Sequence, residues 1–366
     1  MRVLLTGARA PATLELARLC AQAGHEVHVA DTHRWDVCRG SRCVTKRHQL
    51  PAPRVSRARY ALALQELVAR ERLDVVVPTC EEVFHLAAIR DGLGAYVACE
   101  PLERLAPLHD KWRFIAACDA AGAAVPRTYL LTHDSELNGL PPGEYIVKPR
   151  YSRFATCVAR WHTGSALPQQ IDVQSGDWIL QEYRRGVSLC SWSVAAHGEV
   201  VSHSTYAVDA TAGDMGAAIS FHSVRHDGVL AWVRKFITFH KLTGQFAFDF
   251  IEAGNSLCAI ECNPRLTSGI HCFRGRPDAV QALLDPKSAQ RYGFHEAPPG
   301  LRFRSQLALL SFGRWPTAGE SLLAANDDPW PRRLQLYTWS RMLIASALAG
   351  TGPRRWSTRD IEWNGE

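Results

Sequence analysis

Residues 248–265, "FDFIEAGNSLCAIECNPR", predict two strands joined by a tight turn at residues 253–255. Side chains alternate across a strand, so Glu261, Asn263 and Arg265 are expected to share one face of the second strand. Apolar residues lead into this polar row, and a proline ends it. The stretch therefore predicts a β-hairpin with three polar side chains along one face.

The first strand of this hairpin adds a further carboxylate to the prediction. If the turn holds an odd number of residues, Asp249 joins the same face, across or diagonal from the polar row. Cys258, Ile260 and Cys262 are expected on the opposite face. Pro264 denies the second strand a further ladder hydrogen bond, so the residue after it falls at the rim of the sheet.

The chemistry of this face points to a metal and a phosphate. The carboxylates of Asp249 and Glu261 and the amide oxygen of Asn263 are hard oxygen ligands that suit Mg²⁺. Arg265 is a fixed cation that can hold a phosphate or an acyl-phosphate oxygen. The alternative is a solvated strand face with an Arg–Glu pair.

Two lysines and an apolar strand favour the metal interpretation. Lys148 ends the strand in "IVKP", and Lys111 lies at a helix start in "HDKWRF". Two separate lysines and an oxygen-ligand cluster are the parts that a nucleoside triphosphate needs. The strand "ILQEY" at residues 179–183 leads into a turn that can offer hydrogen bonds to a purine.

The N-terminal segment predicts a different unit. "RVLLTG", a helix that begins at Pro11, and "EVHVAD" form a β-α-β pattern typical of a parallel, Rossmann-like sheet. The loop "GARAPA" has one glycine where the nicotinamide fingerprint has three. Glu81 and Glu82 follow the strand "DVVVP" at its carboxyl end, where open α/β sheets place ligands. The alternative is that they are acids suited to a helix N-terminus.

With these motifs the chain resembles the ATP-grasp superfamily, in the carboxylate–amine ligase branch related to the large subunit of carbamoyl-phosphate synthetase. The resemblance implies a fold of α/β and α+β parts. Residues 1–100 would form a Rossmann-like pre-ATP-grasp domain, and residues 101–185 the N-terminal lobe of the ATP-grasp module. Residues 186–300 would form its C-terminal lobe with the metal hairpin, and residues 301–366 a mainly helical extension.

The resemblance also assigns roles. It implies that Asp249, Glu261 and Asn263 are Mg²⁺ ligands, and that Arg265 is the catalytic contact to phosphate or the reaction intermediate. The other positions that it implies are the two ATP lysines and the adenine–ribose contacts: Lys111, Lys148, Gln181, Glu182 and Tyr183.

Two departures from the family pattern stand out. The loop after the second lysine, "RYSRFATCV", has no glycine, and Ser152, Arg153 and Thr156 are left as its phosphate contacts. Ser188 stands where the family commonly has a glutamate for the ribose hydroxyls.

The reaction that the resemblance implies has two steps and uses ATP with Mg²⁺ or Mn²⁺. A substrate carboxylate attacks the γ-phosphate to give an acyl phosphate and ADP, and an amine then displaces phosphate to form an amide or peptide-like bond. The partners would be a small carboxylic acid and a small amine. A homodimer is a possible assembly. A thiol or hydroxyl acceptor and a catalytically silent ATP-binding regulatory protein are the alternatives.

The stretch that follows the hairpin, "LTSGIHCF" at residues 266–273, is expected to line the acceptor pocket through Ser268 and His271. An ordinary loop is the alternative. His271 and Cys272 with Cys258 and Cys262 could also suggest a zinc cluster, but the alternation of the strand points these cysteines away from the acids.

Composition limits the class of protein. The 366 residues carry a net charge of +6 that is spread along the chain, whereas nucleic-acid binders more often show a basic stripe. Eleven cysteines without a CxxC pair argue against a disulfide framework and for a reducing compartment. No signal peptide precedes "RVLLTG", and Arg341 interrupts the short apolar stretch at residues 334–350. A cytoplasmic protein without nucleic-acid or membrane partners is predicted.

Overall fold

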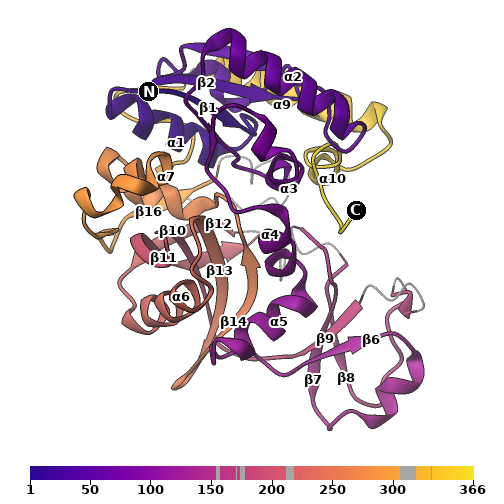
Figure 1. The fold of residues 1–366 in the computed structure, drawn as a ribbon. Coiled ribbons are helices and arrows are strands. Elements are labelled where there is room, and N and C mark those ends of the chain that lie inside the picture. Colours follow the sequence, from indigo (N-terminus) through magenta and orange to yellow (C-terminus); the bar gives the residue numbers. More distant parts are fainter. Residues whose placement is uncertain (154–156, 170, 174–177, 212–217, 306–318, 331) are drawn as a thin grey trace.

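The structure is a computed structural model (Figure 1). It describes residues 1–153, 157–169, 171–173, 178–211, 218–305, 319–330 and 332–366. Thr156, a predicted phosphate contact, lies outside these residues.

The N-terminal unit is a parallel sheet with the strand order β3-β2-β1-β4-β5. Its strands are β1 (Arg2–Thr6), β2 (Glu26–Asp31), β3 (Lys46–Gln49), β4 (Val75–Val77) and β5 (Tyr96–Val97). The central strands are apolar and buried on both faces because helices cover both sides. One face packs against α1 (Pro11–Gln22), and the other against α2 (Arg57–Glu71) and α3 (Glu82–Ala87). The Rossmann-like prediction is confirmed.

Two helices lead from this unit into a small antiparallel sheet. They are α4 (Leu102–His109) and α5 (Lys111–Ala120). The sheet has the order β6-β9-β7-β8, with β6 (Thr128–Leu131), β7 (Glu144–Pro149), β8 (Ala159–His162) and β9 (Trp178–Glu182). Figure 1 shows it as a separate lobe, joined to the rest through α5 and β9.

A larger sheet forms the body of the molecule, with the order β14-β13-β10-β11-β12-β16-β17 and with β15 beside β11. Its strands are β10 (Val187–Ala196), β11 (Glu199–Thr211), β12 (Ala218–Val224), β13 (Gly244–Ala253), β14 (Ser256–Asn263), β15 (His295–Glu296), β16 (Arg302–Arg304) and β17 (Glu320–Ser321). Helix α6 (Asp227–His240) packs on the face that carries Phe246, Phe248 and Phe250.

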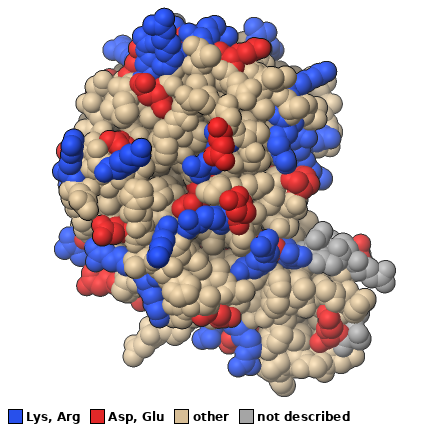
Figure 2. Space-filling model, in the orientation of Figure 1, with Lys and Arg blue, Asp and Glu red and all other residues tan. Residues whose placement is uncertain are grey.

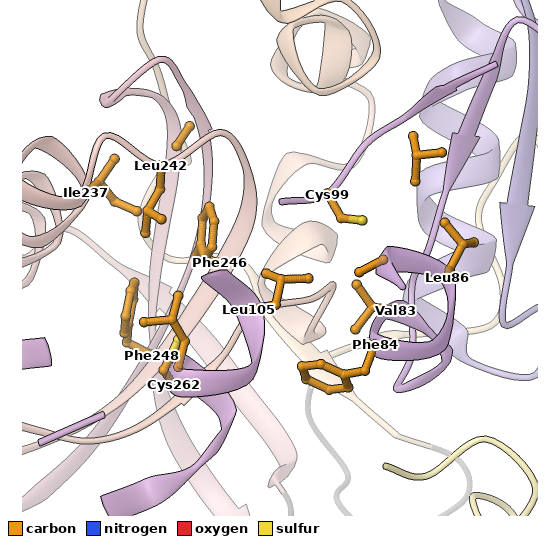
Figure 3. Close-up of a cluster of buried hydrophobic side chains, with 14 of the residues drawn as sticks. Val83, Phe84, Leu86, Cys99, Leu105, Ile237, Leu242, Phe246, Phe248 and Cys262 are labelled. Atoms are coloured by element: carbon orange, nitrogen blue, oxygen red, sulfur yellow. The ribbon is translucent and has the colours of Figure 1, made fainter. Parts of the chain in front are cut away.

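The apolar core is continuous between the two larger units. Figure 3 shows Leu105 of α4 between Phe84 of α3 and the side chains of Phe246 and Phe248 on β13. Burial of this shared apolar surface holds the sheets in a defined orientation, and so places the ends of the strands relative to one another.

Some elements differ from the sequence prediction. Helix α6 ends at His240, before the glycine at residue 244, because Lys241 turns into the left-handed region, with φ 49°. The region after residue 300 was expected to be mainly helical. It contains α9 (Arg332–Leu348) and α10 (Pro353–Trp356), but it also adds β16 and β17 to the large sheet. Within the part of the chain that the structure describes, no helix is long and apolar enough to cross a membrane.

Candidate functional site

The β13–β14 hairpin brings its two carboxylates together through a bulge. The turn holds two residues, since Ala253 pairs with Ser256. A turn with an odd number of residues was the condition for bringing Asp249 to this face, and this turn does not meet it. The register then shifts between Asp249 and Phe250, and Asp249 pairs directly with Glu261. The extra residue in β14 is Ile260, which restores the shared face.

Because of the bulge, one cysteine lies on the opposite face from the one predicted. Cys258 pairs with Ile251, two residues beyond Asp249 on the same strand, so it lies on the carboxylate side of the sheet. Cys262 pairs with Phe248 and packs in the apolar core on the other side, as predicted.

The polar row forms one connected cluster. The side-chain amide of Asn263 donates to Asp249 Oδ2 at 3.4 Å and to Glu261 Oε1 at 3.3 Å. Its oxygen accepts from the guanidinium of Arg265 at 3.2 Å. The four predicted residues of the hairpin therefore lie together, as two acids, an amide and a cation.

Lys111 reaches this cluster from the start of α5. The side chain of Asp110 caps the helix by accepting from the backbone N–H of Trp112 at 3.0 Å. Lys111 Nζ lies 3.3 Å from Glu261 Oε2 and donates to the carbonyl of Ser152 at 3.3 Å. Lys111 is buried, and its ammonium group contacts the acid and the loop after β7.

Lys148 reaches the cluster from the end of β7. Its ammonium donates to Gln181 Oε1 at 2.9 Å and to the carbonyl of Ile260 at 3.1 Å. The contact to Ile260 falls at the β-bulge, so the bulge serves two purposes. It aligns Glu261 with Asp249, and it provides an acceptor for the second lysine.

Burial and charge shift the ionisation of these groups. Burial and the charge of Glu261 raise the pKa of Asp249 to about 6. Burial alone would raise the pKa of Glu261, but Lys111 and Lys148 hold it below its ordinary value. Burial lowers the pKa of Lys148 to about 8, against the opposing effect of Glu261. The two facing carboxylates therefore repel each other, and a cation bound between them would relieve this repulsion.

The predicted adenine–ribose contacts, which we name the hinge, lie at the end of β9 and are Gln181, Glu182 and Tyr183. Gln181 is buried and donates to Thr128 Oγ1 at 3.2 Å, while Glu182 pairs with Arg184 at 3.3 Å. The hydroxyl of Tyr183 accepts from Arg160 at 2.7 Å.

The backbone N–H groups of Glu182 and Tyr183 donate to the carbonyls of Arg127 and Glu144. These two N–H groups are therefore already satisfied in this structure, and a purine would have to bind through other atoms of the hinge.

Ser188 and Cys190 lie on β10 beside the carboxylate cluster. Cys190 pairs with Asp249 and Ser188 with Ile251, so both face the same side as Asp249. Ser188 is exposed. Burial raises the pKa of the Cys190 thiol, and the facing carboxylate of Asp249 raises it further. Cys190 was not predicted as a site residue. Only the alternation of side chains from Ser188 along β10 could have indicated that it lies on this face.

The two acids at residues 81 and 82 have different surroundings. Glu81 forms an ion pair with Arg153, from the loop that follows β7. Glu82 is buried and accepts from Thr6 Oγ1 at 2.6 Å and from the backbone N–H of Thr79 at 3.0 Å. These contacts of Glu82 join β1 to the end of β4, while Glu81 faces the loop that follows β7.

Ser268 and His271 lie in a short 3₁₀ segment, Ser268–Phe273. His271 is buried, and its Nδ1 lies 3.1 Å from Glu15 Oε2 of α1. Arg274 binds the same carboxylate at 2.6 Å. The contacts described for His271 therefore join the two larger units to each other, rather than reaching the carboxylate cluster.

One segment of the chain matches a known protein family. Residues 108–269 match the ATP-grasp domain family. This segment is an ATP-grasp domain. The matched segment begins just before Lys111 and ends just after the β13–β14 hairpin. The sequence matches no curated protein.

Solved structures share this ATP-grasp fold at low sequence identity. An L-amino acid ligase from Bacillus licheniformis has a TM-score of 0.64 and 12% identity, over 82% of this chain and 78% of that one. The N5-carboxyaminoimidazole synthetase from Staphylococcus aureus complexed with ADP has a TM-score of 0.62 and 14% identity, over 82% and 80%. A biotin carboxylase from Campylobacter jejuni has a TM-score of 0.61 and 13% identity, over 82% and 72%. At such identities the likeness shows the fold alone.

Proposed function

We propose that this ATP-grasp protein is an ATP-dependent ligase that activates a carboxylate as an acyl phosphate and transfers it to an amine. The observation that carries the proposal is the cluster of Asp249, Glu261 and Asn263 with Lys111 and Lys148 directed at it. Such a constellation suits phosphoryl transfer, in which the protein contributes positioning and charge neutralisation rather than a covalent nucleophile.

A divalent metal fits this donor set. The two carboxylates and the amide would hold Mg²⁺, and Mn²⁺ takes the same oxygen ligands. The facing acids support the fit, since Asp249 and Glu261 pair across the strands and the charge of Glu261 helps to raise the pKa of Asp249. When bound, the metal would neutralise the negative charge of the phosphates.

The roles of the chain's own residues follow from their charges. Lys111 and Lys148 bind phosphate oxygens, and Arg265 orients the substrate carboxylate and its acyl phosphate. In the first step a carboxylate oxygen bonds to the γ-phosphorus, and the bond between that phosphorus and the bridging oxygen breaks, which releases ADP. In the second step the amine nitrogen bonds to the acyl carbon and loses a proton, and inorganic phosphate leaves.

The alternatives are tested by the same assay. A thiol or hydroxyl acceptor would replace only the second step. The silent ATP-binding alternative rests on the glycine-free loop after Lys148 and on Ser188 in place of the family's common glutamate. All eleven cysteines are free, which suits the cytoplasm that we propose as its location. Size-exclusion chromatography with light scattering would test the proposed homodimer.

The experiment is to measure release of ADP and phosphate from Mg·ATP across a panel of carboxylic acids paired with amines, thiols and alcohols. We expect turnover that requires both an acid and an amine. An acyl hydroxamate formed when hydroxylamine replaces the amine would identify the acyl phosphate. ATP binding without turnover for any pair would reject the ligase and support the silent alternative.

A further inference from the structure

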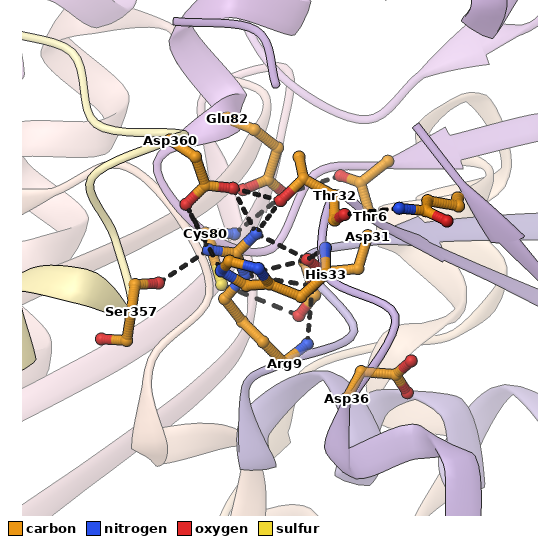
Figure 4. A network of polar contacts seen from close by, with 12 residues as sticks. Thr6, Arg9, Asp31, Thr32, His33, Asp36, Cys80, Glu82, Ser357 and Asp360 are labelled. Atoms are coloured by element: carbon orange, nitrogen blue, oxygen red, sulfur yellow. Dashed lines mark hydrogen bonds and ion pairs between the residues drawn. The ribbon is translucent and has the colours of Figure 1, made fainter. Parts of the chain in front are cut away.

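The last ten residues, 357–366, form a tail that we name the C-terminal strap. It lies between the N-terminal unit and the lobe of β6–β9 (Figure 1). On the N-terminal side, Arg9 NH1 donates to Asp360 Oδ1 at 2.7 Å and to the carbonyl of Ser357 at 2.7 Å. Arg9 also binds Asp31 at 2.6 Å (Figure 4). This end of the strap is anchored at the carboxyl ends of β1 and β2.

The middle of the strap is packed by an aromatic side chain. Trp363 is buried, and its ring stacks on Phe84 of α3 with centroids 5.0 Å apart. The ring also meets Tyr151 edge to face at 5.7 Å. One indole therefore contacts the N-terminal unit and the loop that follows Lys148, and its burial favours this docked position over a free chain end.

The loop is held to the strap by Arg153. Its guanidinium pairs with Glu362 at 2.8 Å, donates to the carbonyl of Trp363 at 2.6 Å and to Asn364 Oδ1 at 3.0 Å, and also pairs with Glu81. The side chain is only 9% exposed. The sequence suggested Arg153 as a phosphate contact, whereas here its charge is directed at two carboxylates. An arginine fork suits this arrangement, because several planar donors are satisfied at once.

The loop in turn contacts the first lysine. Ser152, the neighbour of Arg153, offers the carbonyl that Lys111 Nζ contacts at 3.3 Å. Tyr151 donates its hydroxyl to Asp110, the cap of α5, at 3.2 Å. A continuous set of contacts thus runs from the strap through Arg153 to the lysine that faces Glu261.

We propose that Arg153 is a positioning residue, and that the C-terminal strap acts through it to set Lys111 for the nucleotide. This inference rests on the proposed ATP-dependent function. With the strap docked, the loop holds Lys111 in the position described. Without it, the lysine and the loop must be ordered by the nucleotide at an entropic cost, and nucleotide affinity falls.

The test is a double-mutant cycle with Arg153→Gln, Glu362→Gln and the double variant, with Mg·ADP as the probe in calorimetry. We expect each single variant to weaken ADP binding about fivefold or more, and the double variant to be no weaker than the worse single one. Arg359→Gln, an exposed arginine of the same strap, is the matched control and should bind as the wild type does.

Each outcome separates this inference from the proposed function. Thermal unfolding of each variant distinguishes loss of positioning from loss of fold. Glu362→Gln is the milder of the two single changes. Wild-type binding of ADP with unchanged or tighter binding by the folded variants would overturn the strap inference alone. Fully additive losses would also overturn it, because Arg153 and Glu362 would then act independently. Absence of ADP binding by the wild type would overturn the proposed function as well.

Discussion

Asp249 and Glu261 face each other across β13 and β14 because Ile260 is bulged out of the ladder. With the two-residue turn and no bulge, Asp249 would pair with Ile260, and Glu261 would face Phe248 in the apolar core. The same bulge leaves the carbonyl of Ile260 to Lys148 at 3.1 Å. One irregular residue therefore aligns both acids and one cation.

Glu261→Gln should abolish ligase turnover while leaving the fold intact. The change removes a carboxylate from the proposed metal site and the ion pair of Lys111 at 3.3 Å. We expect kcat to fall at least about 100-fold, the usual scale for loss of one transition-state charge contact. ADP release and circular dichroism measure the two effects. Glu199→Gln, on the exposed start of β11, is the control, and retained activity in Glu261→Gln would refute the metal role.

The pH dependence of kcat/KM for Mg·ATP should be bell-shaped. The pKa of Asp249 is about 6, so activity should rise through this pH as the acid ionises to hold the metal. The pKa of Lys148 is about 8, so activity should fall above this pH as the lysine loses its charge. Lys148→Arg should move the alkaline limb above pH 9, since arginine stays protonated. The exposed Lys46→Arg should leave it in place, and an unmoved limb in Lys148→Arg would count against this assignment.

Asp249→Asn should stabilise the protein in the absence of metal and nucleotide. The pKa of Asp249 is raised to about 6 in the fold, so its stabilising, protonated form is lost as the pH rises through that value. At pH 7.5 the variant lacks this buried negative charge and should gain on the order of 1 kcal/mol. The gain should vanish near pH 4. Urea unfolding at both pH values measures it, with the exposed Asp91→Asn as the control, and destabilisation at pH 7.5 would contradict the prediction.

Glu15→Gln should destabilise the protein without changing acceptor specificity. Burial would raise the pKa of Glu15, but His271 and Arg274 lower it to about 2. The ionised Glu15 therefore stabilises the fold fully above pH 4.5, the ordinary pKa of a glutamate, and this contribution is lost as the pH falls toward 2. At pH 7 the variant should lose roughly 3 kcal/mol, as for a broken buried ion pair.

The difference between Glu15→Gln and the wild type in urea unfolding should shrink below about pH 4. Glu66→Gln, an exposed change on α2, is the control. A changed KM for the amine in folded Glu15→Gln would return His271 to the acceptor pocket, which was its predicted place.

Gly186→Ala should disturb the connection between β9 and β10. An added Cβ at this position would lie 2.0 Å from the carbonyl oxygen of Glu252, which backbone movement alone can relieve. We expect a lower midpoint of thermal unfolding and weaker ADP binding, since the hinge residues lie just before the glycine. Gly139→Ala, where no atom lies within 4 Å of the added Cβ, is the control. Equal unfolding midpoints for the two variants would contradict the expected clash.

The sequence predicted the elements whose pattern is local. The apolar strands with the helix that begins at Pro11 gave the parallel sheet, and the alternation around Glu261 and Asn263 gave the polar row. It did not predict the bulge at Ile260, because a bulge depends on the register between strands and not on residue type. Nor did it predict the partner of His271, since Glu15 lies 256 residues away in the chain.

By itself, the sequence determined the alternation, the strand ends and the residue chemistry, because these depend on neighbours within a few positions. The tertiary structure decided which charges meet. Lys111, Lys148 and Glu261 come from three separate elements, and packing of sheets and helices around a shared core brings them within contact. The C-terminal strap is the clearest case. Nothing local to Glu362 indicates Arg153, and only the docking of Trp363 between Phe84 and Tyr151 places the two side chains side by side.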